Sequence, residues 1–314
     1  MDSAKIYDQV REHHSSASRI TSVKYGETVA KSFGYSAEEF TNIPQDAKLG
    51  LSCGNPFAIT SLKEGEAVIE LGSGVGFDIF LAATKVGPSG RAIGIDMNDD
   101  MVARANRIKS SQPGPTSHIS FIKTSIISVP LPDHAADCII SNCVINLVLH
   151  ADKPAVSRKM HGMLKPGGRV AVSDILTKMP LPEKLREDMA MYVGCIAGTS
   201  EVQEYEGWLK GVGFGKVMVV DTGADLNVYL ITGEDRERKE LCCAPPAAPT
   251  AGASVASGCY DPTAAAAPAP VSGGCCPPTS SIPVPSGLLS EKTDLNEFVG
   301  SYKIFAVKAG VAEK

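Results

Sequence analysis

The sequence predicts an α/β protein built on a seven-stranded, mostly parallel sheet with helices on both faces. From residue 67 onwards, short apolar runs alternate with helix-length segments at the spacing of strand–helix–strand units. The last two predicted strands are separated only by the turn at 221–225, which is typical of an antiparallel hairpin at the end of such a sheet. A glycine-rich loop also joins the first strand to the helix that follows it.

The elements are predicted from the period and length of the apolar runs. A helix stop and turn precede the fifth strand, in the segment KPGG at 165–168. The predicted strands are 67–71, 91–95, 118–123, 136–141, 168–173, 216–220 and 226–232, and the predicted helices lie near 78–86, 98–110, 152–164, 182–194 and 201–211.

The regions that flank this sheet have different compositions. Residues 1–50 carry helix signals at 4–13, at 22–32 and after Ser36, so we expect a helical N-terminal cap over residues 51–235. Residues 236–290 are rich in proline and alanine, as flexible segments are. Residues 291–314 predict a helical turn and then a strand, a small C-terminal extension that must pair with the folded body.

Composition excludes several classes of partner. Apolar residues make up 43% of the 314, and the formal net charge is −5, so no broad basic surface for nucleic acid is expected. No apolar run approaches the length of a membrane span, and the first residues lack the pattern of a secretory signal peptide. We therefore expect a cytoplasmic protein, a monomer, without nucleic-acid or membrane partners.

The glycine-rich loop indicates a nucleotide-like ligand. It reads LGSGVGFD at 71–78, so Phe77 stands where the third glycine of a dinucleotide fingerprint would fall. Glycines tolerate positive φ and let a ligand approach the backbone closely. The second strand ends in Asp96, whose carboxylate is suited to accept hydrogen bonds from ribose hydroxyls, and Met97 is suited to pack on an adenine face. A glycine-rich turn without a ligand is the alternative.

This combination resembles the class I S-adenosylmethionine-dependent methyltransferases, which have a Rossmann-like fold. The resemblance implies that the cofactor is S-adenosyl-L-methionine. The loop at 124–127 lacks the acid or amide often found near the adenine amine, so backbone groups and Ser125 are expected to serve there. The predicted cofactor-binding residues are Glu70, Gly72, Ser73, Gly74, Gly76, Asp96, Met97, Ser125, Ile126 and Asn142.

The nine cysteines fall into two groups. In a chain predicted to be cytoplasmic they are not expected to form a disulfide framework. Cys138 falls inside a predicted strand and is expected to be a small core residue. Cys53, Cys143 and Cys195 lie in predicted loops of the folded part. The remaining five lie in the proline-rich part of the chain, at Cys242, Cys243, Cys259, Cys275 and Cys276.

The three loop cysteines suggest a soft, three-coordinate centre. Cys143 follows the end of the fourth strand, where the ligand crevice of such a sheet opens. The wide spacing of Cys53, Cys143 and Cys195 does not match a structural zinc site, whereas three thiolates from separate segments suit a soft ion. Trivalent arsenic fits this description. Bound by three sulfurs, it keeps a lone pair that can attack a methyl group without a general base.

Three cysteine motifs make the resemblance specific. They are KLGLSCGNP at 48–56, ISNCVINL at 140–147 and YVGCIAG at 192–198. Together with 71–78 and LKPGGR at 164–169 they resemble the arsenite methyltransferase family, from about residue 25 to residue 233.

The family resemblance implies an activity and a set of ligands. Methyl groups would pass from S-adenosyl-L-methionine to As(III) bound by Cys53, Cys143 and Cys195, with arsenite or methylarsonous acid as acceptor. Glutathione or thioredoxin would be the thiol reductant, and the outcome would be arsenic detoxification. Some family members carry a further cysteine in the N-terminal helical region. This chain has none before Cys53, which argues against a disulfide relay through that position.

Other interpretations stay open at this stage. A small-molecule C- or O-methyltransferase of the same fold would use the glycine loop without the cysteines. A non-catalytic arsenic-binding protein would use the cysteines without the cofactor, although the intact loop and Asp96 count against it. The pairs Cys242–Cys243 and Cys275–Cys276 are consistent with arsenic delivery and equally with thiols that have no role in turnover.

Two further predictions concern single polar residues. None of the six histidines is expected to be a ligand, and His13 and His14 are predicted on a solvated helix face. Asp174, at the predicted end of the fifth strand, either lines the site or caps the strand.

Overall fold

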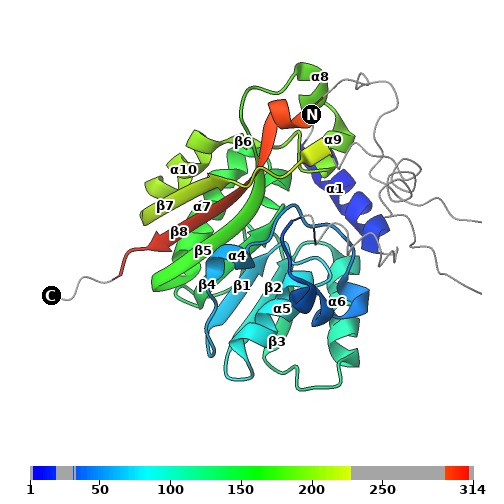
Figure 1. Cartoon of the computed structure of the whole chain (residues 1–314), viewed down its shortest axis with the longest axis vertical. Coiled ribbons are helices and arrows are strands. Elements are labelled where there is room, and N and C mark those ends of the chain that lie inside the picture. Colours follow the sequence, from blue (N-terminus) through cyan, green and yellow to red (C-terminus); the bar gives the residue numbers. More distant parts are fainter. Residues whose placement is uncertain (1–2, 19–30, 32, 228–293, 311–314) are drawn as a thin grey trace, which may run out of the picture.

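The computed structural model describes residues 3–18, 31, 33–227 and 294–310 (Figure 1). Its centre is a sheet with strand order β3-β2-β1-β4-β5-β8-β7, and the short β6 pairs with β5. The strands from β3 to β5 are parallel, whereas β8 is antiparallel to both of its neighbours. The strands are β1 Ala67–Leu71, β2 Arg91–Asp96, β3 Ile119–Lys123, β4 Ala136–Asn142, β5 Leu164–Thr177, β6 Ser200–Glu201, β7 Phe214–Asp221 and β8 Val299–Lys308.

Helices cover both faces of this sheet, as the sequence predicts (Figure 1). None of the helices in the described ranges is long and apolar enough to cross a membrane. The helices are α1 Ser3–Ser18, α3 Ala37–Thr41, α4 Phe57–Thr60, α5 Phe77–Val86, α6 Asp99–Ser111, α7 Lys153–Met163, α8 Glu183–Arg186, α9 Met189–Val193 and α10 Val202–Gly211.

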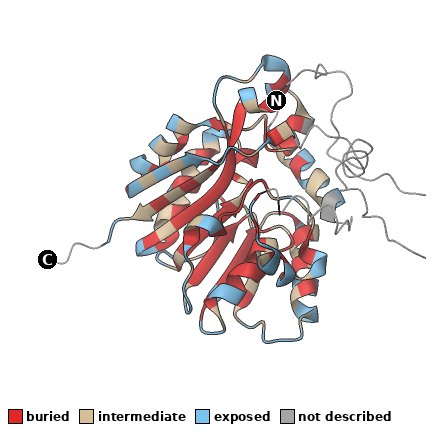
Figure 2. Ribbon diagram, viewed as in Figure 1, coloured by how far each residue is buried: buried red, intermediate tan, exposed pale blue. Residues whose placement is uncertain are grey.

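The alternation of side chains along the central strands creates two cores. Ile69 and Leu71 of β1 are fully buried in a cluster with residues of α7 and α10, and Val68, directly before Ile69, belongs to a cluster with α5 and α6. All five residues of β1 are buried, and Figure 2 shows the central strands as the most buried part of the molecule. Strands covered on both faces are expected to be mostly apolar, which explains the apolar residues at 67–69 and 71, with the buried Glu70 as the exception.

Capping residues explain where α3 begins, as predicted, and why the predicted helix at 182–194 is divided in two. Ser36 caps α3 through a capping box with Glu39, as expected from its position. The predicted helix at 182–194 is divided into α8 and α9, because Asp188 accepts a hydrogen bond from the Met191 amide at 2.8 Å and starts a new helix. Helix α1 continues to Ser18, beyond the predicted end at 13, and the predicted helix at 22–32 lies mostly outside the described residues.

The last strand of the sheet differs from the predicted one. The antiparallel neighbour of β7 is β8, which pairs with β7 on one side and β5 on the other. Of the predicted hairpin between 216–220 and 226–232, the first strand is confirmed as part of β7. Leu226 and Asn227 lie outside any strand, and 228–232 lie outside the described residues. The predicted strand near the C-terminus is confirmed, and it lies inside the sheet rather than at its edge.

Reciprocal hydrogen bonds link the segments 225–227 and 294–296, which are far apart in sequence. The Leu226 amide donates to the Asn296 side chain at 2.8 Å, and the Leu295 amide donates to the Asn227 side chain at 2.9 Å. Leu226 and Leu295 are both fully buried. Since β8 follows directly after 294–296, this pairing holds its first residues beside the end of β7.

Strand β8 should contribute strongly to stability because its apolar residues lie in the core. Ile304 is fully buried between Val172 of β5 and Val219 of β7. We expect Ile304→Ala to lower the free energy of unfolding by about 2–4 kcal/mol, measured by chemical denaturation. Met218→Ala on β7, where the side chain is 57% exposed, should change it by less than about 0.5 kcal/mol. Equal effects of the two substitutions would contradict this placement of β8.

Candidate active site

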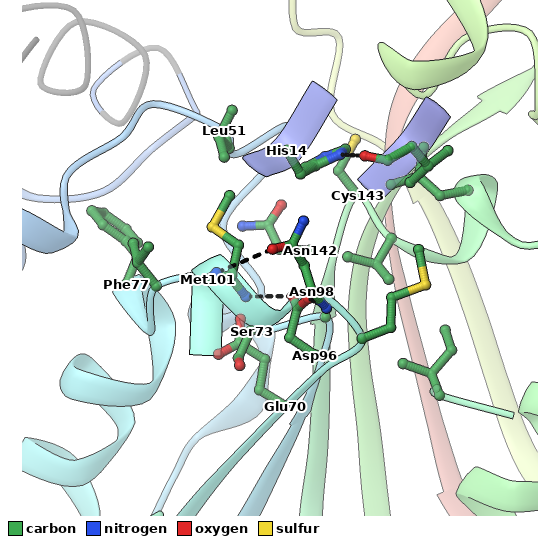
Figure 3. A pocket seen from close by; sticks show the side chains of 18 of the residues that line it. His14, Leu51, Glu70, Ser73, Phe77, Asp96, Asn98, Met101, Asn142 and Cys143 are labelled. Carbon is green, nitrogen blue, oxygen red and sulfur yellow. Dashed lines mark hydrogen bonds between the residues drawn. The ribbon is translucent and has the colours of Figure 1, made fainter. Parts of the chain in front are cut away.

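A pocket opens at the carboxyl ends of β1, β2 and β4, where open parallel sheets bind their ligands (Figure 3). All of the predicted cofactor-binding residues except Gly76 line it. Gly76 instead forms the N-cap of α5 with φ +92°, a backbone conformation that favours glycine. The sequence therefore predicted most of one wall of this pocket, and the cofactor roles of these residues remain predictions.

The glycine loop is folded tightly onto the end of β2. The amides of Gly72 and Ser73 both donate to the Ile95 carbonyl, at 2.7 and 2.9 Å, and the Gly74 amide donates to the Asp96 carboxylate at 2.8 Å. Gly72 has φ +73°, and a Cβ atom there would lie 2.2 Å from a methyl group of Val144. The loop thus needs glycine at position 72 both for its backbone conformation and for its packing.

Two buried carboxyl groups and a half-buried one make this pocket suited to a cationic ligand. Burial raises the pKa of Glu70 well above its usual value, and Asp78 and Asp96 raise it further. Burial raises the pKa of Asp78 to about 6 and also raises that of Asp96. The Glu70 Oε2 and Ser73 Oγ atoms are buried, and neither has a hydrogen-bond partner among the residues that the structure describes. A positively charged, polar ligand would stabilise these groups in their ionised form.

S-adenosyl-L-methionine fits this set of residues. It carries a sulfonium and an ammonium group that match the carboxyl groups, and ribose hydroxyls that match Asp96. Met97 and Ile126 provide apolar surface in the same pocket for an adenine ring.

The Asn142 amide connects the pocket to the first cysteine. Its Nδ2 lies 3.1 Å from the Asp78 carboxylate and 2.9 Å from the Gly54 carbonyl, and its Oδ1 accepts the Cys53 amide at 3.2 Å. The Tyr35 hydroxyl donates to Asp78 at 2.6 Å and completes this buried network. Nothing in the local sequence around Asp78 or Tyr35 indicates this role, because the contacts join segments distant in the chain.

Helix α1 forms another wall of the pocket, through residues that include Tyr7, Val10 and His14. The Asn98 side chain donates to the Arg11 carbonyl at 2.8 Å and fixes α1 against the start of α6. The prediction that His14 faces solvent is therefore wrong: its ring lines the pocket and donates to the Val10 carbonyl at 2.8 Å (Figure 3). Burial lowers the pKa of His14, so the ring is expected to be neutral at pH 7.

The structure brings the three predicted cysteines together. Cys53 and Cys143 are joined by a disulfide, with their Cα atoms 5.6 Å apart. The Cys195 thiol donates to the Cys143 carbonyl at 2.8 Å. All three are buried, and Cys143 also lines the pocket. Their proposed role as arsenic ligands remains a prediction, and one pair is oxidised in this structure instead of being free thiols.

Backbone strain is concentrated at two of these cysteines. Cys143 has φ +58° and Cys195 has φ +65°, values that are uncommon for residues other than glycine. Such conformations cost roughly 1–3 kcal/mol and persist only where the surroundings enforce them. Cys138, by contrast, is an ordinary buried residue of β4, and burial raises the pKa of its thiol to about 12, as expected for a core cysteine.

Asp174 is a member of the cysteine cluster. One of its carboxylate oxygens and the sulfurs of Cys53 and Cys143 all lie within 4.8 Å of one another. Because β5 continues to Thr177, the alternative that Asp174 caps the end of the strand is wrong. Burial raises the pKa of Asp174 to about 7, and the Lys153 ammonium opposes that shift. The sequence left Asp174 undecided because the true end of β5 was not predicted.

Lys153 is a functional candidate that the sequence did not reveal. It is the first residue of α7, and only 1% of its side-chain surface is exposed. Its Nζ donates to the Gly198 carbonyl and, at 2.8 Å, to Ser200 Oγ. Burial lowers the pKa of Lys153 to about 8, whereas the nearby Asp174 raises it. A lysine at a helix start predicts a solvated side chain, so only the fold shows its burial.

Comparisons with known proteins agree with this architecture. A family model described as "Methyltransferase domain" matches residues 62–213. A Halobacterium salinarum protein named arsenite methyltransferase is 36% identical over 66% of this chain and 55% of its own length. The human arsenite methyltransferase is 29% identical over 54% of this chain and 46% of its own. The chain thus spans about half the length of these relatives.

A solved structure shows the same fold. The arsenic(III) S-adenosylmethionine methyltransferase from Chlamydomonas reinhardtii superposes with a TM-score of 0.52 at 20% identity, covering 92% of this chain and 75% of that one. This likeness confirms the predicted class of fold.

The glycine loop gives a test of the pocket. We expect Gly72→Ala to reduce the affinity for S-adenosyl-L-methionine by about 10-fold or more in titration calorimetry, because the added methyl group collides with Val144. Gly207→Ala on the exposed face of α10, where nothing lies within 4 Å, should leave the affinity unchanged and stabilise the helix by up to about 1 kcal/mol. Full affinity in the Gly72 variant would contradict this picture of the loop.

Proposed function

We propose that this chain, whose sequence is similar to those of proteins named arsenite methyltransferase, transfers methyl groups from S-adenosyl-L-methionine to trivalent arsenic held by Cys53, Cys143 and Cys195. The acceptor is arsenite, methylarsonous acid or both, and the reaction serves arsenic detoxification in the cytoplasm.

The position of Cys143 carries this proposal. Cys143 lines the pocket suited to the methyl donor. Its sulfur is joined to the sulfur of Cys53, and its backbone carbonyl accepts a hydrogen bond from the thiol of Cys195. Methyl transfer requires donor and acceptor to be in contact and aligned. A residue shared by the donor pocket and the thiol cluster supplies that proximity.

Arsenic binding by the reduced site is a series of ligand exchanges. Each time a thiol sulfur forms a bond to arsenic, an As–O bond breaks, and the thiol proton leaves with the hydroxide as water. Burial raises the pKa of the Cys195 thiol well above its usual value, so this residue brings its own proton to the leaving hydroxyl. The arsenic lone pair then attacks the methyl group of S-adenosyl-L-methionine: the As–C bond forms, the sulfonium S–C bond breaks, and S-adenosylhomocysteine leaves. The methylated arsenic is then formally pentavalent, and it returns to the trivalent state when two of its thiolate sulfurs leave as a disulfide.

The disulfide between Cys53 and Cys143 must be opened before arsenic can bind to both sulfurs. A thiol reductant such as glutathione or thioredoxin would open it by thiol–disulfide exchange. Two reductant thiols are oxidised to a disulfide, and Cys53 and Cys143 each gain a hydrogen. The reductant is therefore a co-substrate in this proposal.

Substitution of the cysteines tests the proposal. In reduced protein, Cys143→Ser or Cys195→Ser should lower the rate of arsenite methylation by about 100-fold or more, because the lost thiolate removes or misplaces the bound acceptor. Arsenic speciation after incubation with thiol and S-adenosyl-L-methionine measures this rate. Cys138→Ala is the matched control: it removes a buried thiol outside the cluster and should retain activity, at a stability cost of about 1 kcal/mol.

Two outcomes would overturn the proposal. The first is the absence of methylated product when the reduced wild-type protein is given either arsenite or methylarsonous acid. The second is methylation of a carbon or oxygen acceptor that survives both cysteine substitutions, which would favour the small-molecule methyltransferase. A protein that binds arsenite but no S-adenosyl-L-methionine would be the non-catalytic arsenic binder.

A further inference from the structure

The Asp78 carboxyl group lies in the wall of the pocket and is held there by two polar side chains. Asp78 is the second residue of α5, and only 2% of its surface is exposed. The Tyr35 hydroxyl donates to its Oδ1 atom at 2.6 Å, and Asn142 Nδ2 donates to its Oδ2 atom at 3.1 Å. Asn142 Nδ2 also donates to the Tyr35 hydroxyl at 3.1 Å, so the three groups form a closed triangle. The orientation of the carboxylate is therefore fixed.

The ring of Tyr35 is itself fixed by aromatic packing. It is buried and packs edge-on against Phe77, with the ring centroids 5.2 Å apart. Phe77 also lies against Phe40 of α3, with centroids 6.4 Å apart. Edge-to-face contacts of this kind prefer one relative orientation of the rings. Because the ring is held in this way, the Tyr35 hydroxyl presents its hydrogen bond to Asp78 in a defined direction.

The charge around Asp78 is not balanced by the residues that line the pocket. The charged groups that shift the pKa of Glu70 and of Asp78 are other carboxyl groups, and each of them raises it. Of the lining residues in the described part of the chain, only Arg11 carries a full positive charge, and it is paired with Asp8 on the same helix. Acids that interact with one another in this way are stabilised as anions when a cationic ligand binds beside them.

The order of the strands indicates which part of the methyl donor reaches Asp78. Asp96 is the last residue of β2 and Asn142 the last residue of β4, and β1 lies between these two strands. Neighbouring strands are about 4.8 Å apart, so the two strand ends are separated by roughly 10 Å. The sulfonium sulfur of the donor carries the ribose, the methyl group and the chain of the amino acid. With the ribose at Asp96 and the methyl group directed to Cys143 (Figure 3), the amino acid chain is the substituent that remains to face the acids beside the end of β4. Of these acids, Asp78 is the one that contacts Asn142 directly.

We propose that the Asp78 carboxylate binds the ammonium group of the donor's amino acid moiety, and that Tyr35 is the positioning residue that holds the carboxylate for it. This inference rests on the proposed function, which directs the methyl group to Cys143. Tyr35 and Asn142 each occupy one lone pair of a different carboxylate oxygen, so each oxygen keeps a second lone pair for an ammonium N–H. Hydrogen bonds between two charged groups are stronger than those between neutral ones. The donor is thus recognised by its amino group as well as by its ribose.

A purely structural role at the start of α5 would not require this arrangement. An acid in the first turn of a helix is stabilised by the helix dipole at an exposed position, as Asp99 is at the start of α6, where its side chain is 75% exposed. Asp78 is buried instead, and burial raises its pKa to about 6. A bound ammonium group would lower that pKa and offset the cost of burying the carboxylate.

The test is a thermodynamic cycle between a side chain and one group of the ligand. Titration calorimetry compares S-adenosylhomocysteine with its deaminated analogue, which lacks only the amino group, so the ratio of the two affinities reports recognition of the ammonium. The ratio is measured without any arsenical in the whole parent chain, in Asp78→Asn and in Tyr35→Phe. The matched controls are Asp137→Asn, at the opposite end of β4 from the pocket, and Tyr205→Phe on α10, which removes a buried hydroxyl that has no hydrogen-bond partner among the described residues.

The expected ratios separate binding of the ammonium from general packing. The parent should prefer S-adenosylhomocysteine, and Asp78→Asn should lower this preference by about 10-fold or more, because a hydrogen bond between two charged groups is lost. Tyr35→Phe should lower it by about 3-fold, since the carboxylate is retained but less well oriented. Both controls should keep the parent ratio. A parent that binds the two ligands equally would overturn the proposal, and so would an Asp78→Asn variant that weakens both ligands by the same factor.

Tyr35→Phe covers the case in which Asp78→Asn does not fold, because it keeps the carboxylate and removes only one hydroxyl. A parent-like ratio in Tyr35→Phe would then overturn the proposal. The outcome is also distinguishable from that of the proposed function. The expected ratios in a chain that methylates no arsenic would refute the proposed function and leave this assignment standing, whereas an unchanged ratio in an active arsenite methyltransferase would do the opposite.

Discussion

The side-chain amide of Asn142 is the interaction on which the architecture of the site depends. It lies at the end of β4, contacts Asp78 and the Gly54 carbonyl through its nitrogen, and accepts the Cys53 amide through its oxygen. A polar group buried without a partner costs about 1–3 kcal/mol, so each of these contacts helps to hold the half-buried amide in place. Asn142 thus fixes the loop that carries Cys53 relative to the Asp78 carboxyl group, which lines the pocket. Cys143 follows Asn142 directly in the sequence, so the same contacts also hold the second cysteine.

The sheet brings the cysteine loops to a common edge, and β8 completes the arrangement. The Ser301 hydroxyl of β8 donates to the Cys53 carbonyl at 2.9 Å, from a position 248 residues later in the chain. Leu226, Leu295 and Val299, from the ends of β7 and β8, belong to the same apolar cluster as the three cysteines. The antiparallel strand therefore stabilises the sheet and also supports the loop that carries Cys53.

Buried charges divide the site into two electrostatic regions. Around the glycine loop, Glu70, Asp78 and Asp96 are all acids whose ionised forms are destabilised by burial, and a cationic cofactor would offset that cost. Around the cysteines, Asp174 is accompanied by the buried ammonium of Lys153. The region around the glycine loop is complementary to a positively charged methyl donor. In the region around the cysteines, the charges of Asp174 and Lys153 offset each other.

Local sequence determined the strand and helix order, the glycine loop, the acid at position 96 and the three loop cysteines, because periodicity, turn chemistry and motif spacing are properties of short segments. It missed β8 as the neighbour of β7, since strand pairing across a long separation depends on long-range packing rather than on the adjoining turn. It also missed the place of His14, which lines the pocket because α1 is held against the start of α6. It missed the burial of Lys153, whose ammonium donates to the Gly198 carbonyl in the loop at 194–199. The sequence by itself identified the glycine loop, Asp96 and the three loop cysteines as candidates. The tertiary structure alone decided which groups meet, because contacts between distant segments arise only when the sheet and its covering helices are assembled.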